Sequence, residues 1–224
     1  MSLPWVQTKL GKYATDYLNK EFGTKLSIEK VEITIFGNIK LKNVVSKDIN
    51  NINLFTIKDL KTSIASYVDF KKLIDQGHPY FDFINADELE LHILQNKGEK
   101  QSNLDQFIDA FDDGKPGSGK FRMLVQSINI TNSKFTYTDY NLQTPKVLNL
   151  KNLNAKLIDF KIKGSDVTTN INSLVFDDHR GLKIKRLISK FTYTKTNIIL
   201  DELDLKTAHS TLKGKIKLNY TIKD

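Results

Sequence analysis

The sequence predicts a mostly β protein, in which a curled antiparallel sheet, shaped like a trough, is accompanied by an N-terminal amphipathic helix and two short helices. From Lys25 onward, apolar and polar residues alternate with the period of two that is typical of half-buried strands. Only three stretches carry a helical period. The hexapeptide SKFTYT occurs at 133–138 and again at 189–194, which indicates a sheet that grows by adding similar hairpins.

The composition excludes several classes of protein. The 224 residues include 34 Lys and Arg against 26 Asp and Glu, a net charge of +8, yet the lysines are dispersed among apolar residues. Dispersed lysine is typical of the solvated faces of strands, and only secondarily of an anionic partner. Without cysteine there is no disulfide, thiolate metal site or cysteine nucleophile. No apolar run reaches the roughly 18–20 residues of a membrane-spanning helix.

The strongest helical pattern covers residues 4–22. Pro4 stands in the first turn, where its missing N–H costs nothing, and Gly23 provides the C-terminal stop. This predicted helix has two interpretations. It is either a packing element that caps the sheet, or a segment that emerges from a bilayer and places aromatic and basic residues at the membrane interface. In the second interpretation the membrane-proximal residues are Trp5, Val6, Lys9, Leu10 and Lys12.

The first hairpin is predicted from its register. A two-residue turn would place apolar residues opposite lysines, whereas a three-residue loop pairs Ile35 with Ile39. The next pair is then Ile33 with Leu41, so that all four apolar residues share one face. We therefore predict the three-residue loop, with Asn38 in the left-handed conformation that asparagine tolerates.

The rest of the first half combines strands and short helices, and a linker follows it. Strands are predicted at 53–64 and 82–94, and a helix at 67–76. A further helix begins at Ser102, with an apolar face made of Leu104, Phe107, Ile108 and Phe111. The predicted organisation is an N-terminal region of helix, hairpins and two short helices (1–111), a Gly-rich linker (112–120) and a region of repeated β hairpins (121–224). The sequence leaves open whether the two regions share one sheet.

The second half is predicted to begin with a tight hairpin. A two-residue turn at 132–133 places Ile128 and Ile130 opposite Phe135 and Tyr137 and keeps all four on one face. Leucine-alternating strands, LKNLNA and LDELDL, follow the two copies of SKFTYT.

The predicted strands present more apolar surface than the predicted helices can cover. Each strand has one apolar face, and an apolar face left in water costs roughly 25 cal/mol per Å², while only three helices are available as cover. A two-sheet β-sandwich satisfies this demand. A single sheet curled into a trough, whose apolar side meets lipid chains or a partner, satisfies it equally. Thr, Asn and Ser interrupt several inward faces, which favours the trough slightly.

No motif points to catalysis or to a cofactor. The segment GKPGSGK at 114–120 has the spacing of a phosphate-binding loop, but Phe121 replaces the required Ser/Thr and a helix precedes it. The four histidines lie far apart, and DDHRG at 177–181 reads as a hairpin turn rather than a metal site. Phe135 and Tyr137 alternate with threonine, which suits burial better than base stacking. We therefore expect no enzyme, no metal, no cofactor and no nucleic acid.

The opening block, LPWVQTKLGKYATDYLNKEFGTKLSIEKVEITIFGNIKLKNVVSKD, resembles the N-terminal part of the TamB/AsmA-like family of bacterial envelope proteins, which are bridge-like lipid transfer proteins. In that family an inner-membrane helix runs into an amphipathic helix and then a β hairpin with a Gly-Asn tip and a K-L-K-N-V return strand. The segment SNLDQFIDAF is similar to the family's Asn-Leu helix, and INITNSKFTYTD with LKNLNAKLIDF is similar to its later hairpins.

The resemblance implies a periplasmic protein anchored to the inner membrane through a helix outside this sequence, of which this chain is the membrane-proximal portion. Its expected activity is to provide a hydrophobic β-groove for phospholipid transfer between membranes, or for outer-membrane protein assembly. The implied partners are a phospholipid or other acyl-chain lipid, the inner membrane and an outer-membrane assembly protein. The alternative is a non-enzymatic β-sandwich module for protein–protein interaction in the envelope. The predicted groove-lining residues are Ile33, Ile35, Ile39, Leu41, Ile128, Ile130, Phe135 and Tyr137.

Overall fold

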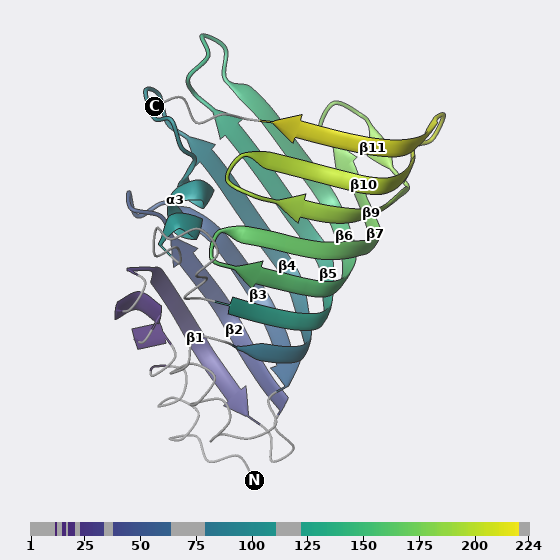
Figure 1. The fold of residues 1–224 in the computed structure, drawn as a ribbon. Helices are drawn as coiled ribbons and strands as arrows, with labels where there is room; N and C mark the ends of the chain where they lie inside the picture. Colours follow the sequence, from purple (N-terminus) through teal and green to yellow (C-terminus); the bar gives the residue numbers. More distant parts are fainter. Residues whose placement is uncertain are drawn as a thin grey trace.

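The computed structural model of the protein describes residues 12, 15–16, 18–20, 23–33, 38–63, 79–110 and 122–219, the side chain of Ile33 excepted. The chain is mostly β, as predicted, and the eleven strands of its described part form one large open sheet rather than the two sheets of a sandwich (Figure 1). The elements are β1 (Lys25–Ile33), β2 (Asn38–Lys47), β3 (Asn53–Ser63), β4 (Tyr80–Gln95), α3 (Asn103–Asp109), β5 (Arg122–Asp139), β6 (Lys146–Lys163), β7 (Asp166–Asp178), β8 (Lys183–Ile184), β9 (Arg186–Tyr193), β10 (Asn197–Lys206) and β11 (Thr211–Asn219).

Strands from both halves of the chain belong to the same sheet. Its order is β1-β2-β3-β4-β5-β6-β7-β9-β10-β11, with β8 paired to β7. The two halves meet where β4 pairs with β5 in parallel, from Tyr80 opposite Leu124 to Gln95 opposite Asp139. The other pairings among the described strands are antiparallel, so the sheet is mixed and not wholly antiparallel as predicted. A parallel pair needs a crossover connection, and α3 lies within it.

Helix α3 agrees with the predicted helix that begins at Ser102. Ser102 caps α3, and a reciprocal capping box joins it to Asp105. Near the N-terminus, the described residues 12, 15–16 and 18–20 are helical. The Asn19 side chain fixes the end of this helix to β1, because it accepts a hydrogen bond from the Leu26 N–H and donates one to the Leu26 carbonyl. The predicted helix at 67–76 and the linker at 112–120 lie outside the described residues.

Two predicted hairpin registers are wrong. In the first hairpin Ile33 pairs with Ile39, and Val31 with Leu41, so five residues separate the first pair instead of three. Apolar residues still face apolar residues, which is why the pattern alone did not distinguish the two registers. The predicted turn at 132–133 does not exist, since these residues lie inside the continuous strand β5.

A row of left-handed residues crosses the sheet where the second wrong turn was predicted. Asn43 in β2, Glu88 in β4, Asn132 in β5 and Asn152 in β6 have φ angles of 50°, 51°, 52° and 52°. The strand pairing brings these residues into line. Asn43 of β2 lies opposite Lys58 of β3, and Lys58 in turn lies opposite Glu88 of β4. Left-handed residues bend strands. We call this row the crease.

The crease divides the sheet into two leaves. Leaf A, on the side of α3, contains 44–47, 53–57, 89–95, 133–139 and 146–151. Leaf B contains 38–42, 59–63, 80–87, 122–131 and 154–163, and β9–β11 continue it through the lower-numbered half of β7. Left-handed Asp159 and Glu202 mark a second bend within leaf B.

Contacts made by α3 show how strongly the sheet is curled. In a flat sheet, the five strand-to-strand steps from β3 to β9 would span roughly 24 Å at ~4.8 Å each. Yet the short helix α3 contacts both strands, with Phe107 against Phe55 of β3 and Asp105 bonded to Tyr193 of β9. Leaf B is therefore folded back toward leaf A, as Figure 1 shows for β9–β11 in front of the long strands.

The sheet ends at β1 on one side and at β11 on the other, and no other described strand pairs with the outer edge of β11. Its sequence, TLKGKIKLN, places exposed Lys213, Lys215 and Lys217 along that edge. A compact apolar cluster lies further inside leaf B, built on Ile171, Ile184, Leu187 and Leu203. This cluster supports β7–β10.

Candidate functional site: the inner face of the sheet

The inner face of the sheet, defined as the face that carries Phe55 and therefore contacts α3, is apolar in continuous rows. Residues that pair directly on neighbouring strands share a face of the sheet. In leaf A one such row runs Phe55, Leu91, Phe135, Leu150, and the next runs Ile93, Tyr137, Leu148. In leaf B one row runs Ile39, Thr62, Ile84, Ile128, Leu157, with Thr62 as its one polar member, and the other runs Val31, Leu41, Leu60, Ala86, Ile130, Ala155.

The crease keeps the rows of both leaves on the same face. Thr131 and Asn132 are consecutive, yet both side chains donate hydrogen bonds to the same carboxylate oxygen of Asp87. Two successive residues thus point outward, and the flanking Ile130 and Ser133 both point inward. Phe135 and Tyr137 then follow Ser133 on the inner face by ordinary alternation.

Six of the eight predicted groove-lining residues therefore belong to one face, namely Ile39, Leu41, Ile128, Ile130, Phe135 and Tyr137. The backbone of Ile33 pairs with Ile39, but the Ile33 side chain lies outside the described part of the chain. Ile35 lies outside the described residues. Of the predicted membrane-proximal residues, Lys12 is helical and exposed, while Trp5, Val6, Lys9 and Leu10 lie outside the described residues. Sequence reasoning missed Phe55, Leu91 and Leu150, although strand alternation marks each of them.

Much of this face is only half-buried. Ile39 and Ile128 are buried, with 6% and 8% of their surface exposed. In contrast, Leu41, Ile130, Phe135 and Tyr137 keep intermediate exposure. A packed core leaves few such side chains partly open, so the inner face has apolar surface to offer a ligand.

Two tyrosines of the repeated hexapeptide come together at one end of the inner face. Tyr193 Oη donates a hydrogen bond of 2.8 Å to Asp105 Oδ1 of α3. Tyr137, on the opposite leaf, is close enough to Asp105 that burial, the Asp139 carboxylate and the Asp105 carboxylate together raise the pKa of its phenol. Tyr137 Oη also lies 3.3 Å from Gln95 Oε1. The repeat thus supplies one tyrosine from each leaf beside the same carboxylate.

The serine of each repeat stands beside a left-handed glutamate, and the lysine that follows it forms an ion pair. Ser133 bonds to the peptide group that follows Glu88, and Ser189 to the peptide group that precedes Glu202. On the outer face, Lys134 pairs with Glu90 at 2.6 Å and Lys190 with Glu202 at 2.5 Å. Each copy of the repeat therefore lies beside a bend in the neighbouring strand, at Glu88 of β4 for the first copy and at Glu202 of β10 for the second.

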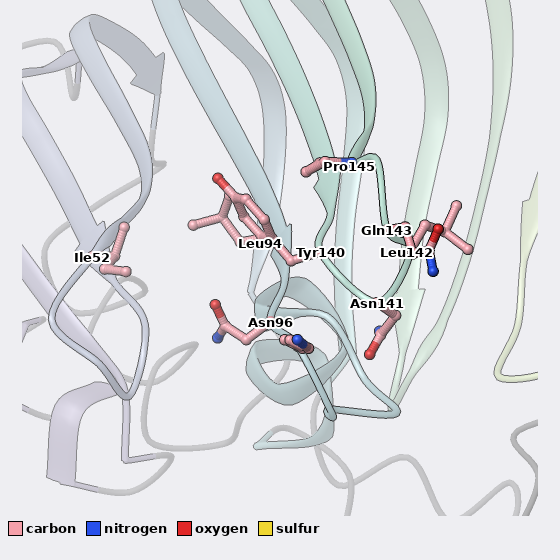
Figure 2. A pocket seen from close by; sticks show the side chains of 9 residues that line it. Ile52, Leu94, Asn96, Tyr140, Asn141, Leu142, Gln143 and Pro145 are labelled. Atoms are coloured by element: carbon pink, nitrogen blue, oxygen red, sulfur yellow. The ribbon is translucent and has the colours of Figure 1, made fainter.

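One pocket lies at the loop end of the sheet and contains none of the predicted lining residues. Its volume is about 630 Å³. Figure 2 shows side chains from the loops at 48–52, 96–101 and 140–145 around it. The lining consists of Ile52, Leu94, Asn96, Lys97, Tyr140, Asn141, Leu142, Gln143 and Pro145. This shallow, mixed surface has no arrangement of acid, base or nucleophile.

The segment 177–181 is a hairpin turn, as predicted. Asp178 accepts hydrogen bonds from the Arg180 N–H, Nε and Nη2, and Gly181 has a φ of 92°. No cluster of metal-ligating side chains occurs in the part of the chain that the structure describes. Among the helices of that same part, none has the length and apolar character needed to cross a bilayer.

Comparison of the sequence with protein-family models and with curated proteins finds no match.

Proposed function

We propose that the protein is a non-enzymatic lipid-binding element of a periplasmic, inner-membrane-anchored envelope protein of the TamB/AsmA type, and that its curled sheet is a trough for acyl chains. The observation that carries the proposal is the inner face: continuous apolar rows on two leaves, with half-buried side chains at Ile130, Phe135 and Tyr137. Acyl chains would cover this surface without requiring any polar group of the protein. The resemblance of the opening block supports the same assignment.

The trough would serve phospholipid transfer between the membranes or the assembly of outer-membrane proteins. Both uses need the same physical property, an apolar path that is shielded from water. The outer face is suited to water, since its side chains along the crease are polar and exposed, as in the Lys58–Glu88 pair at 2.6 Å.

Site-specific photo-crosslinking tests the trough. Phe135 and Tyr137 are replaced one at a time by p-benzoylphenylalanine, and Lys134 and Thr136 serve as matched controls, because they lie on the same strand but on the opposite face. After irradiation in the native host, mass spectrometry measures covalent phospholipid adducts. We expect adducts at Phe135 and Tyr137 and few at the controls. Equal labelling of both faces, or no lipid adduct at any position, overturns the proposal.

A second candidate function is docking of a partner protein by strand addition. The observation in its favour is the unpaired, largely exposed edge of β11. The same experiment separates the two functions, because a crosslinker at Leu218 of β11 would then capture a protein, while Phe135 would capture no lipid.

A further inference from the structure

Helix α3 connects the two leaves by two different faces. Asn103 and Phe107 are four residues apart and share one face, and Asp105 and Asp109 share another. The first face is directed to leaf A, where the rings of Phe107 and Phe55 meet edge-on with their centroids 6.0 Å apart. The second is directed to the end of β9 in leaf B. The helix therefore spans the opening between the leaves.

The contact with leaf A is deeply seated. The side chain of Asn103 accepts a hydrogen bond from the Leu94 N–H at 2.9 Å and donates one to the His92 carbonyl at 3.1 Å. It thereby imitates the backbone of a further strand beside β4, and only 3% of Asn103 is exposed. Removing such a group would leave buried backbone groups unpaired.

The contact with leaf B is shallow. It includes the hydrogen bond from Tyr193 Oη to Asp105 and an ion pair of 3.1 Å between Lys195 and Asp109. The Lys195 and Asp109 side chains are 46% and 36% exposed, and exposed ion pairs of this kind contribute little. No residue of α3 other than Asn103 is buried. Elements with little buried surface open first.

We propose that α3 is a strap across the open side of the trough, anchored on leaf A through Asn103 and released from leaf B when the Tyr193–Asp105 and Lys195–Asp109 contacts break. Release lets an acyl chain enter between the leaves, where the apolar side chains Leu104, Phe107 and Ile108 of α3 then cover it. This inference rests on the proposed lipid-binding function and adds a gate to it.

The chain has no cysteine, so the strap can be fixed chemically. In the locked variant, Lys195→Cys and Asp109→Cys are joined by a bismaleimide that contains a cleavable disulfide. In the released variant, Tyr193→Phe and Lys195→Ala remove both contacts and leave the capping box of Ser102 and Asp105 intact. The matched control joins Lys190→Cys to Glu202→Cys, a pair of similar length that connects β9 to β10 without α3.

The readout is the rate at which the purified protein takes up a fluorescent phosphatidylglycerol from vesicles. We expect the released variant to load roughly ten-fold faster, the factor that corresponds to one lost hydrogen bond to a charged group. We expect the locked variant to load more slowly until the linker is cleaved, and the control to load at the wild-type rate.

Uptake at the wild-type rate by both the locked and the released variants overturns the strap while leaving the trough intact. Failure of every variant, including the wild type, to take up lipid overturns the proposed function and the strap with it. Circular dichroism of each variant confirms that the sheet is folded before its rate is compared.

Discussion

The hydroxyl group of Ser133 accepts a hydrogen bond from the Leu89 N–H at 3.0 Å and donates one to the Thr131 carbonyl at 2.7 Å. Only 1% of Ser133 is exposed. The crease separates β4 from β5 at this point, and the serine side chain restores the hydrogen bond that the ladder loses there.

We expect Ser133→Ala to lower the free energy of unfolding by about 1–3 kcal/mol, because the amide of Leu89 loses its partner. Urea denaturation followed by circular dichroism measures the change. A variant as stable as the wild type would mean that water satisfies this amide and that the serine is dispensable.

Ser189→Ala should be the milder of the two serine substitutions. The Ser189 hydroxyl donates to the Asp201 carbonyl at 2.8 Å, and a carbonyl tolerates the loss of one partner better than an N–H does. We expect a loss of about 0.5–1 kcal/mol in the same urea experiment. A larger loss than that of Ser133→Ala would contradict this ranking.

The left-handed conformation of Asn132, with φ at 52°, predicts an unusual order of substitutions. Asn132→Gly should cost little, whereas Asn132→Val should cost at least about 1–2 kcal/mol more, since a β-branched residue is strained at positive φ. At the neighbouring strand residue Thr131 the order should reverse, with valine preferred to glycine. Denaturation of all four variants gives the comparison, and the same order at both positions would argue against the crease.

The lysine of the repeat should matter little to stability. Lys190 and Glu202 form an ion pair of 2.5 Å, but their side chains are 60% and 67% exposed. We expect Lys190→Ala to change the free energy of unfolding by less than about 0.5 kcal/mol. A double-mutant cycle with Glu202→Ala at low and high salt measures the coupling, and a large salt-independent value would refute this expectation.

The Asp178 turn predicts a dependence of stability on acid pH. Hydrogen bonds from Arg180 hold the pKa of Asp178 at about 2, below its ordinary 3.8. A lowered pKa in the folded state stabilises the protein above the unfolded pKa, and this stability is lost as pH falls from about 4 to about 2. Asp178→Asn should therefore destabilise the protein near neutral pH, and the difference from the wild type should shrink across that window. Denaturation midpoints at several pH values measure it, and a difference that stays constant would be contrary to this assignment.

Strand alternation predicted most of the sheet and most of the inner face. It identified Ile128, Ile130, Phe135 and Tyr137 as members of one face, and they are. The same alternation led to a wrong prediction of the backbone between them, because it placed a hairpin turn at 132–133 where β5 is continuous. The apolar phase of the sequence changes between Ile130 and Phe135, and both a hairpin turn and a single left-handed residue produce that change.

The information that decides between those two explanations is not local. A hairpin would turn the chain back at 132–133, whereas β5 continues as one strand beside β4, which pairs with it from Leu124 to Asp139. The contact between Tyr193 and Asp105, 88 residues apart, is equally beyond any pattern of neighbours. The periodicity of a single sequence indicates which apolar side chains share a face of a strand. The position of the bend depends on pairing between residues that are far apart in the sequence.

The lysines of β11 have a consequence for behaviour at high concentration. A long unpaired edge is a template on which a second molecule can extend the ladder, and three exposed lysines at alternate positions make two such edges repel each other. That repulsion is ionic, so concentrated salt weakens it. Solutions of this protein should remain dispersed in dilute buffer and begin to self-associate edge to edge when ionic strength is raised.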